Sequence, residues 1–386
     1  MKLILKTALV VMLLFAVAVT LSFSGGFGGE VREVFAPIET GLIVLAPIET
    51  PGPTPTPSPT PEPEEPPEEP PEEYIYVPCP YTVTILLSAA GDTTLGGDAR
   101  WAGYHAFMRE FRESGNDHSV FFTNVAHIFR ESDISVLNLE GTLTDVTYPH
   151  MDKTFVFRGP PHFAQILSYI DIVSIANNHT IDFFERGMRD TRAALYAENI
   201  LYFGNEFNTI MEVNGIKVGF FGFRIWWDGA DNRNRITAAI EDLRERGAQL
   251  VIAYHHWGVE RENFPEQYQI GIGRHSIRAG ADLVLGAHPH VLQGIEEYQG
   301  RFIVYSLADF CFGGNATPDD QDSIIFQQKF TFYRGVLQPY NDINIIPLFM
   351  SSVRYRNDFR PTIAEGEDAE RIMARLERYS NWLVGR

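Results

Sequence analysis

The sequence predicts an α/β domain over residues 81–386, because short apolar runs alternate with segments of helical spacing throughout that range. Each of five of these runs is followed within three residues by Asp, Glu, Asn or His, at the place where the strand would end. Two further segments, residues 1–25 and 26–80, differ in composition and are not expected to join the domain. The chain is therefore divided into a hydrophobic N-terminal segment, a linker and one folded domain.

The N-terminal segment, residues 1–25, predicts export. Lys2 and Lys6 precede residues 8–23, which carry no charge and are rich in Leu, Val, Ala and Phe. A basic start followed by such a run is typical of a secretory signal, and a length of about sixteen residues borders on what spans a bilayer. The segment is thus a signal peptide or an N-terminal membrane anchor. The basic start favours an extracytoplasmic location for the rest of the chain, either anchored to the cell membrane or secreted.

Residues 26–80 are expected to form a disordered linker rich in Pro, Thr and Glu. Residues 51–73 contain eleven of the 24 prolines and seven Glu. Such a composition cannot bury enough apolar surface to fold, and it favours an extended, polyproline-like spacer. We therefore expect a stalk between the N-terminal segment and the folded domain.

The acidic composition excludes nucleic acid as an expected partner. The chain has 31 Lys and Arg against 50 Asp and Glu, which gives a formal net charge of −19 at pH 7. Nucleic-acid backbones require a basic face, which this balance does not favour. The chain has only two cysteines, Cys79 and Cys311, so a zinc site made of several cysteines is excluded as well.

Five strands and five helices are predicted within the folded domain. The expected strands cover residues 82–90, 134–139, 171–176, 250–254 and 281–285. The expected helices cover residues 119–130, 185–198, 237–247, 267–280 and 368–379. In open α/β sheets, functional sites form beyond the carboxyl ends of the strands. The polar residues that follow all five strands therefore predict one shared site.

The residues at these strand ends are of the types that bind metal ions or transfer protons. In chain order they are Asp92, Glu140, Asn178, His179, His256, His288 and His290. In an extended segment, residues two apart point to the same side, so His288 and His290 are expected to face one ion. The neighbours His255 and His256 should point to opposite faces, and we expect His256 to face the site and His255 to be structural.

Six short motifs occur in order along the domain. They are GDTTLG at 91–96, NLEG at 138–141, ANNH at 176–179, HWGVE at 256–260, GAHPHVLQG at 286–294 and YSL at 305–307. This set resembles the CapA family, which is linked to the synthesis or export of the poly-γ-glutamate capsule. The fold of that family resembles the calcineurin-like metallophosphoesterases. The resemblance therefore implies an αββα sandwich with metal ligands on the loops at the strand ends.

The resemblance also implies a role for each candidate residue. The implied metal ligands are Asp92, Glu140, Asn178, His256, His288 and His290, and they would hold one or two divalent ions. Mixed oxygen and imidazole ligands suit Mn, Fe or Zn, and the sequence does not choose among the three. His179 matches the His of the phosphoesterase Gly-Asn-His motif, which implies a general acid that protonates the leaving oxygen. The residues expected to support these ligands or to contact substrate are Asn138, Asn177, Asp182 and Glu260.

Two departures from the expected patterns leave the function open. The phosphoesterase pattern has Asp-x-His at the first motif, whereas this chain has Thr94 in place of the His. The CapA pattern often has Asn at the position of Asp309. The loss of one expected ligand at Thr94 weakens the case for a complete two-metal site, whereas a site with only a structural role would not need His179.

Two hypotheses follow from these residues. The first is a metal-dependent hydrolase of phosphoester or polymer bonds. The second is a non-catalytic surface factor, tethered to the membrane through its N-terminal segment, that binds the capsule polymer or components of a membrane synthase. Binding of an anionic polymer would need a local basic patch, for which the candidates are Lys153, Arg158, Arg261, Arg274 and Arg278.

Overall fold

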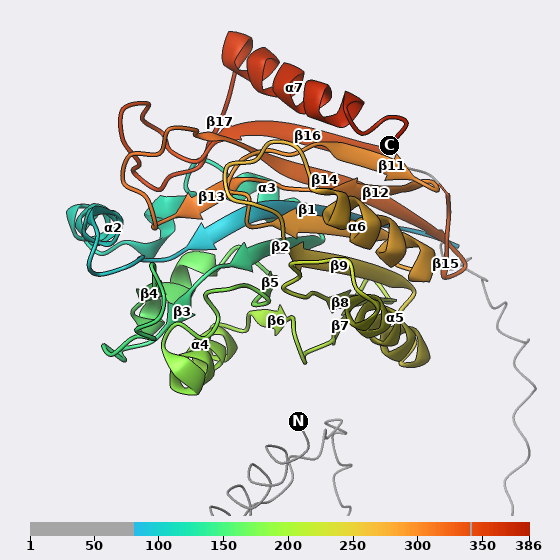
Figure 1. Ribbon diagram of the computed structural model, residues 1–386, viewed down its shortest axis with the longest axis horizontal. Coiled ribbons are helices and arrows are strands. Elements are labelled where there is room, and N and C mark those ends of the chain that lie inside the picture. Colours follow the sequence, from blue (N-terminus) through green and yellow to red (C-terminus); the bar gives the residue numbers. More distant parts are fainter. Residues whose placement is uncertain (1–80, 340–341) are drawn as a thin grey trace, which may run out of the picture. The chain divides into compact units, whose positions relative to one another are not determined.

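Two stacked β-sheets form the centre of the fold in the computed structural model, which describes residues 81–339 and 342–386 (Figure 1). One hydrophobic cluster fills the space between the sheets, and two others lie between each sheet and the helices on its outer face. The order of layers is therefore helix, sheet, sheet, helix, in agreement with the predicted αββα sandwich. The export segment and linker predicted for residues 1–80 lie outside the described residues.

Strand β1 (Thr82–Thr94) is at the centre of the first sheet, which has nine strands among the described residues. The order is β17 (Thr362–Ile363), β16 (Asp342–Phe349), β14 (Asp322–Tyr333), β1, β2 (Ile134–Leu139), β5 (Ile172–Ser174) and β6 (Leu201–Phe203), with β13 (Asp309–Phe312) beside β1 and β15 (Val336–Leu337) beside β14. Strands β1, β2, β5, β6 and β13 pair in parallel. The C-terminal strands β14 to β17 pair antiparallel.

The second sheet has six strands in the part of the chain that the structure describes. Their order is β11 (Ile295–Tyr298), β12 (Arg301–Val304), β10 (Leu283–Ala287), β9 (Leu250–His256), β8 (Ile216–Phe221) and β7 (Thr209–Val213). The four middle strands are parallel, and β9 and β10 are buried along their whole length. Such nearly continuous apolar strands are typical of parallel sheets covered on both faces. A separate two-stranded ladder joins β3 (Thr142–Leu143) to β4 (Arg158–Gly159).

Helices cover the outer faces of both sheets. Those that pack on the first sheet are α2 (Ala102–Glu113), η1 (His118–Phe122), α3 (Ala126–Arg130), η2 (Pro161–Leu167) and α4 (Phe184–Ala197). Those that pack on the second sheet are α5 (Ala230–Glu245) and α6 (Gln267–Ala279). Among the described residues, no helix combines the length and the apolar character needed to cross a membrane.

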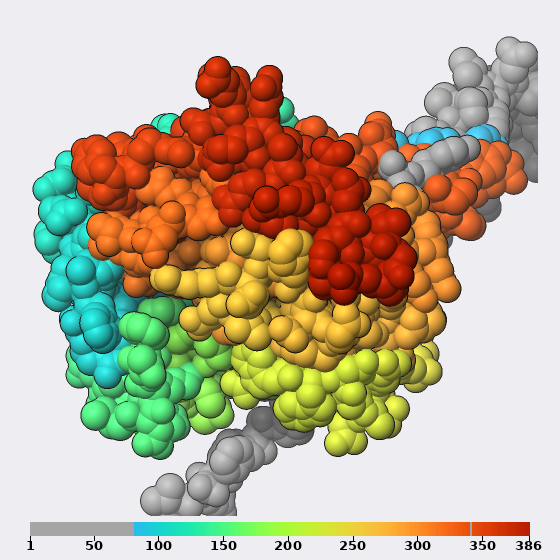
Figure 2. Space-filling view, turned by 45° about the horizontal axis from the view of Figure 1, so that its top comes forward, coloured from blue at the N-terminus to red at the C-terminus, as the bar shows by residue number. Residues whose placement is uncertain are grey.

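The C-terminal helix α7 (Gly366–Asn381) closes the side of the sandwich at which β16 and β11 lie. Its buried residues Ile372, Leu376 and Tyr379 join the cluster between the sheets. Figure 2 shows this helix in red beside the gold segment that leads into α6. The ring of Phe264 in that segment lies 5.3 Å from the ring of Tyr379 and 5.0 Å from that of Trp382.

All five predicted strands are present, as β1, β2, β5, β9 and β10. The helix predicted over residues 119–130 is wrong as a single element, because it divides into η1 and α3. The break includes Val125, which is fully buried and has φ −128, a value outside the helical range. Helix α2 and the antiparallel strands β14 to β17 were not predicted, and neither were β3, β4, β6, β7, β8, β11, β12 and β13.

The predicted site is built where the parallel strands of both sheets end. Asp92 of β1 pairs in register with Asn138 of β2, and Ala287 of β10 pairs with His256 of β9. The hydroxyl of the buried Tyr254 donates a hydrogen bond of 2.7 Å to the carbonyl of Ala90, which joins the two sheets just before the site. The strand ends of the two sheets are thereby held next to each other.

Gly91→Ala should unfold this part of the sandwich, because β1 and β13 approach too closely for a side chain. A Cβ at Gly91 would lie 1.8 Å from the carbonyl oxygen of Ala308, which also accepts a hydrogen bond from the Asp92 amide. We expect the substitution to lower the free energy of unfolding by more than about 3 kcal/mol in urea denaturation.

Gly215→Ala is the matched control for this measurement. Gly215 has φ +77, and a Cβ there would meet no atom within 4 Å. The control should lose about 1 to 2 kcal/mol from backbone strain alone. Equal losses in the two variants would contradict the close approach of β1 and β13.

Candidate metal centre

The structure brings the six predicted metal ligands together at the joined strand ends. Three overlapping groups have ligand atoms within 4.8 Å of one another: Asp92 with Glu140 and His256, Glu140 with His288 and His290, and Asp92 with His290 and Asp309. Asn178 joins them, since its Oδ1 lies 2.6 Å from Nε2 of His256. We call Asp92, Glu140, Asn178, His256, His288, His290 and Asp309 the candidate metal centre.

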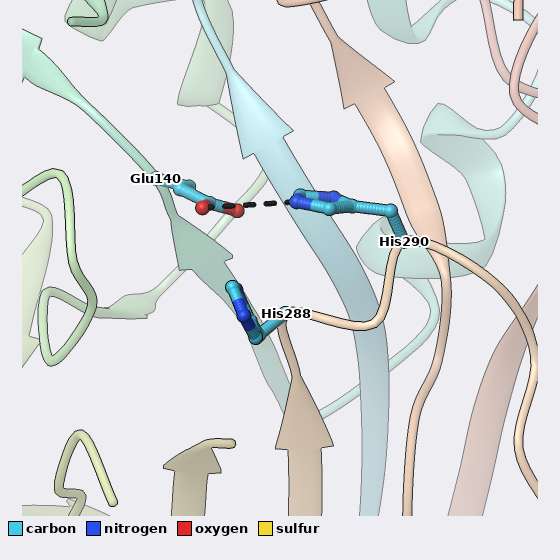
Figure 3. Close-up of side chains that lie close together, drawn as sticks. All are labelled: Glu140, His288 and His290. Carbon is cyan, nitrogen blue, oxygen red and sulfur yellow. Dashed lines mark ion pairs between the residues drawn. The ribbon is translucent and has the colours of Figure 1, made fainter. Parts of the chain in front are cut away.

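Like His288, whose Nδ1 has no hydrogen-bond partner among the described residues, Glu140 has incomplete contacts (Figure 3). Its side chain is fully buried, and neither carboxylate oxygen accepts a hydrogen bond from a described residue. Oε1 lies 3.7 Å from Nε2 of His256 and 3.8 Å from Nε2 of His179. The distance from Oε1 to Nε2 of His290 is 4.0 Å. These separations are too long for hydrogen bonds, so the imidazole nitrogens face the carboxylate without satisfying it.

A divalent cation fits this arrangement. A buried carboxylate without a hydrogen-bond donor is unfavourable unless a positive charge is close to it. Burial raises the pKa of Glu140 well above its usual value, and the nearby carboxylate of Asp92 raises it further. The donors around Glu140 are imidazole nitrogens and oxygens, which are the ligand types that bind Mn, Fe and Zn.

Asp92 is held by both sheets. Its Oδ1 accepts a hydrogen bond of 2.7 Å from the side-chain amide of Asn138, on β2 of the first sheet. Its Oδ2 accepts a hydrogen bond of 2.9 Å from the backbone amide of His288, after β10 of the second sheet. Burial raises the pKa of Asp92 to about 6. The Asn138 amide thus fixes the orientation of the Asp92 carboxylate, which is the supporting role expected for Asn138.

The loop with His288 and His290 does not have the predicted conformation. The two residues have φ values of 96° and 58°, so the segment is bent and not extended. Each of the two imidazoles nevertheless has a nitrogen within 4.8 Å of a carboxylate oxygen of Glu140, because the bend turns both rings toward that carboxylate (Figure 3). Non-glycine residues with positive φ are uncommon and are concentrated at functional sites. The geometry that joins the two rings therefore comes from a strained turn.

Asp309 completes the surroundings of His290. Its Oδ1 lies 2.8 Å from Nδ1 of His290. Although burial alone would lower the pKa of His290, the carboxylates of Asp309 and Glu140 raise it well above its usual value. Asp309 was not among the predicted ligands, and the only signal in the sequence was its place in the YSL-Ala-Asp segment, where the family often has Asn.

His256 and His255 point in opposite directions, as predicted. Nδ1 of His256 lies 3.4 Å from Nδ2 of Asn138, and burial lowers the pKa of His256 well below its usual value. A neutral imidazole retains the lone pair that a metal ligand needs. His255 faces the helical layer, where its Nε2 lies 3.1 Å from Oγ of Ser276.

His179 is fixed by a network on its far side. Its Nδ1 lies 2.6 Å from Oδ2 of Asp182, and its ring stacks on Phe157 with centroids 4.1 Å apart. Asp182 is fully buried and also accepts hydrogen bonds of 2.5 Å from Lys153 and from the backbone amide of Phe157. Burial lowers the pKa of His179. The network leaves Nε2 of His179 directed to Glu140.

The remaining residues considered in the sequence lie outside the candidate metal centre. Asn177 links the end of β2 to the loop after β5, since its side-chain amide donates to the carbonyl of Leu139 at 2.8 Å and its Oδ1 accepts from the His179 amide at 3.0 Å. Glu260 is exposed on the loop after β9. Thr94, which stands where the phosphoesterase pattern has His, donates a hydrogen bond of 2.6 Å to the carbonyl of Glu140.

The cations considered for a basic patch are individually paired. Lys153 contacts Asp182, Arg261 lies 3.3 Å from Asp319, and Arg274 lies 2.5 Å from Glu296. Arg278 donates to the hydroxyl of Tyr298, and Arg158 lies over the rings of Tyr104 and Phe183. These contacts give no support to a shared anion-binding patch.

A pocket of about 540 Å³ opens beside the candidate metal centre. His179, His290 and Asp309 line it from the side of the metal centre. Four aromatic side chains line it further: Trp101, Phe155, Phe157 and Phe312. We call it the aromatic pocket.

Comparisons with known proteins match this region. A family model described as bacterial capsule synthesis protein PGA_cap matches residues 86–314, which include all residues of the candidate metal centre. The PGA biosynthesis protein CapA of Bacillus subtilis (strain 168) is 29% identical over 226 residues, which are 53% of this chain and 60% of the relative. The capsule biosynthesis protein CapA of Bacillus anthracis is 28% identical over 176 residues, 40% of this chain and 43% of the relative.

A third relative is similar over a longer stretch. A probable polyglutamine synthesis accessory protein of Mycobacterium tuberculosis (strain ATCC 25618 / H37Rv) is 24% identical over 289 residues, 64% of this chain and 73% of the relative. The chain spans less than two thirds of the length of the two Bacillus relatives.

Glu140→Gln should stabilise the protein when metal has been removed. The raised pKa of Glu140 means that the folded state is penalised as pH rises above the ordinary value of 4.5, and the penalty is complete above the folded-state pKa. We expect chelator-treated Glu140→Gln to be more stable than wild type at pH 8 by roughly 1 to 3 kcal/mol. The difference should be much smaller at pH 5, as measured by urea denaturation.

Glu241→Gln serves as the control, because Glu241 is exposed on α5. It should change stability at neither pH. A loss of stability in chelator-treated Glu140→Gln at pH 8 would mean that the carboxylate has a favourable partner, and it would remove the argument for a cation.

Proposed function

This chain belongs to the PGA_cap family of bacterial capsule synthesis proteins, and from that premise we propose that it is a metal-dependent hydrolase in poly-γ-glutamate capsule synthesis. Its substrate would be a phosphoester or a bond of the polymer. The observation that carries this proposal is the buried Glu140 carboxylate, which accepts no hydrogen bond from the described part of the chain and faces three imidazoles. Such a group favours a bound cation, and the neighbouring His179, which a purely structural site would not need, favours a reaction at that cation.

The residues that would hold the ion are those of the candidate metal centre. One or two ions would be held by Asp92, Glu140, Asn178, His256, His288 and His290. A bound divalent ion supplies Lewis acidity that polarises an oxygen of the substrate. Asp309 would support this set by holding Nδ1 of His290. The hydrogen bonds from Asn138 and from the His288 amide fix the orientation of Asp92 before any ligand binds.

His179 is the residue we assign to proton transfer. Its Nδ1 is engaged by Asp182, so Nε2 is the nitrogen that faces the reacting groups. Asp182 holds the ring in one orientation and stabilises the imidazolium that forms when Nε2 carries a proton. That proton is then available to the leaving oxygen or nitrogen, which is the general-acid role.

The second candidate function is a non-catalytic factor that binds the capsule polymer or a membrane synthase. Thr94 favours it, because its hydroxyl is used in a hydrogen bond to the Glu140 carbonyl and supplies no imidazole to a second ion. In both cases we propose an extracytoplasmic protein that is anchored through its N-terminal segment or secreted. The two functions differ in whether His179 matters to a reaction.

The metal content of the full-length protein and its hydrolytic activity test the proposal together. We expect near-stoichiometric Mn, Fe or Zn in the wild type and its loss when His288 and His290 are both changed to Ala. His179→Asn should retain the metal but lower the rate of hydrolysis by about 10²- to 10⁴-fold. Elemental analysis gives the first result, and assays with bis(p-nitrophenyl) phosphate and γ-linked polyglutamate give the second.

His275→Asn is the matched control, because His275 lies on α6 and contacts Thr237 and the Arg233 carbonyl. It should leave metal content and rate unchanged. A folded wild-type protein that takes up no metal after reconstitution would rule out the hydrolase. Full metal occupancy with no activity on either substrate would favour the binding factor.

A further inference from the structure

The aromatic pocket contains a continuous row of rings that leads from the surface to the candidate metal centre. Trp101 is 51% exposed, and its ring centroid lies 5.6 Å from that of Phe155. Phe155 is followed by Phe157 at 6.3 Å, and Phe157 by Phe312 at 5.7 Å. The row ends at two imidazoles, because Phe157 stacks on His179 at 4.1 Å and Phe312 lies 4.8 Å from His290. 

This pocket has the size and composition of a binding site. Its volume of about 540 Å³ falls within the range of small-molecule pockets, roughly 300 to 1,000 Å³. Two of its rings are unusually accessible for their size, since Phe155 is 41% exposed in addition to Trp101. Large apolar side chains exposed together beside a buried polar centre are typical of ligand contacts.

Carboxylates outnumber Lys and Arg in the lining of the pocket, although Asp309 among them lies 2.8 Å from Nδ1 of His290. Arg261 is the only Lys or Arg among the described residues that line it, whereas the lining includes Glu260, Asp309, Asp319 and Asp320. Arg375 neutralises Asp320 at 2.7 Å, and Arg261 contacts the exposed Asp319 at 3.3 Å. Glu260 has no hydrogen bond or ion pair to any described residue. A ligand with many carboxylates is therefore disfavoured along these walls.

We propose that the aromatic pocket binds an ammonium group next to an apolar or ring-shaped part of the ligand. Aromatic faces attract ammonium groups through the charge distribution of the ring, and Trp does so most strongly. Glu260 adds a carboxylate that forms no ion pair with a cation in residues 81–339 or 342–386. This proposal rests on the proposed function, because it places the ammonium group on the substrate whose reacting bond lies at the candidate metal centre.

Two kinds of substrate carry this chemistry. A γ-linked glutamate chain has one ammonium group at its amino end and carboxylates along the rest, so only that end suits the pocket. An amino sugar has an ammonium group on a ring that can stack on Trp101. With the glutamate chain the pocket selects the amino end, which would make the site act at chain ends and not along the polymer.

Paired ligands that differ only in the amine test this inference. The binding of γ-linked tetraglutamate with a free amino end is compared with its N-acetylated form, and glucosamine is compared with N-acetylglucosamine. Binding to the full-length protein is measured by ligand-observed NMR and calorimetry, with chelator and again with Mn or Zn. We expect the free amine to bind at least about 5-fold more tightly in one pair, and that pair identifies the source.

Two variants test whether the preference for the free amine arises in the aromatic pocket. Glu260→Gln should reduce the preference for the free amine, and Trp101→Ala should weaken binding of the preferred ligand about 5-fold or more. Glu262→Gln is the control, because Glu262 is an exposed neighbour that does not line the pocket.

The possible results separate this inference from the proposed function. No preference for the free amine in either pair, or a preference that survives both Glu260→Gln and Trp101→Ala, would overturn it. A preference that persists in a protein without metal or hydrolytic activity would retain the pocket inference while the hydrolase fails.

Discussion

The carboxylate of Asp92 is the group on which the arrangement of this site depends. One of its oxygens is bound to a side chain from the first sheet and the other to a backbone amide from the second sheet. The same residue pairs with Asn138 along the β1–β2 ladder, and its own amide donates to the carbonyl of Ala308. Asp92 therefore links the two sheets at the point where their ligands meet, next to the hydrogen bond from Tyr254 to the carbonyl of Ala90.

This constraint also concentrates negative charge in the interior. Asp92, Glu140 and Asp309 are all buried, and burial raises the pKa of each. His290 is the counter-charge within their reach, and it is shared by all three. One imidazolium cannot satisfy three carboxylates, so the centre is stable in its ionised form only with additional positive charge. The same residues that reduce the stability of the metal-free fold are thus the ones that favour a divalent ion.

The sequence predicted the parts of this site that depend on strand order. Asp92, Glu140, Asn178 and His256 each lie at the end of a parallel strand, and the carboxyl ends of parallel strands meet at one edge whatever the loops do. The opposite directions of His255 and His256 followed from the alternation of side chains along a strand. The αββα architecture was implied by the family resemblance, and periodicity identified five strands but not the antiparallel half of the first sheet.

Other features depend on contacts that periodicity does not encode. The bend at His288 and His290 is set by positive φ values, which an extended segment would not have. Asp309 reaches the site because β13 lies parallel to β1 although the two are far apart in sequence. In the sequence, the only sign of a special role for Asp309 was that the family often has Asn at this position. Helix α2 was missed, and with it the neighbouring Trp101 that begins the row of rings.

The short segment of residues 153–157 connects the two parts of the site. Lys153 and the backbone amide of Phe157 both donate to Asp182, which holds His179. The ring of Phe157 stacks on the same imidazole and continues the aromatic row toward Phe155. A ligand that contacts these rings would therefore touch the same segment that holds the His179 imidazole in place. The shape of the aromatic pocket and the orientation of His179 therefore both depend on the conformation of this segment, because Phe155 and Phe157 line the pocket while Lys153 and the Phe157 amide hold Asp182.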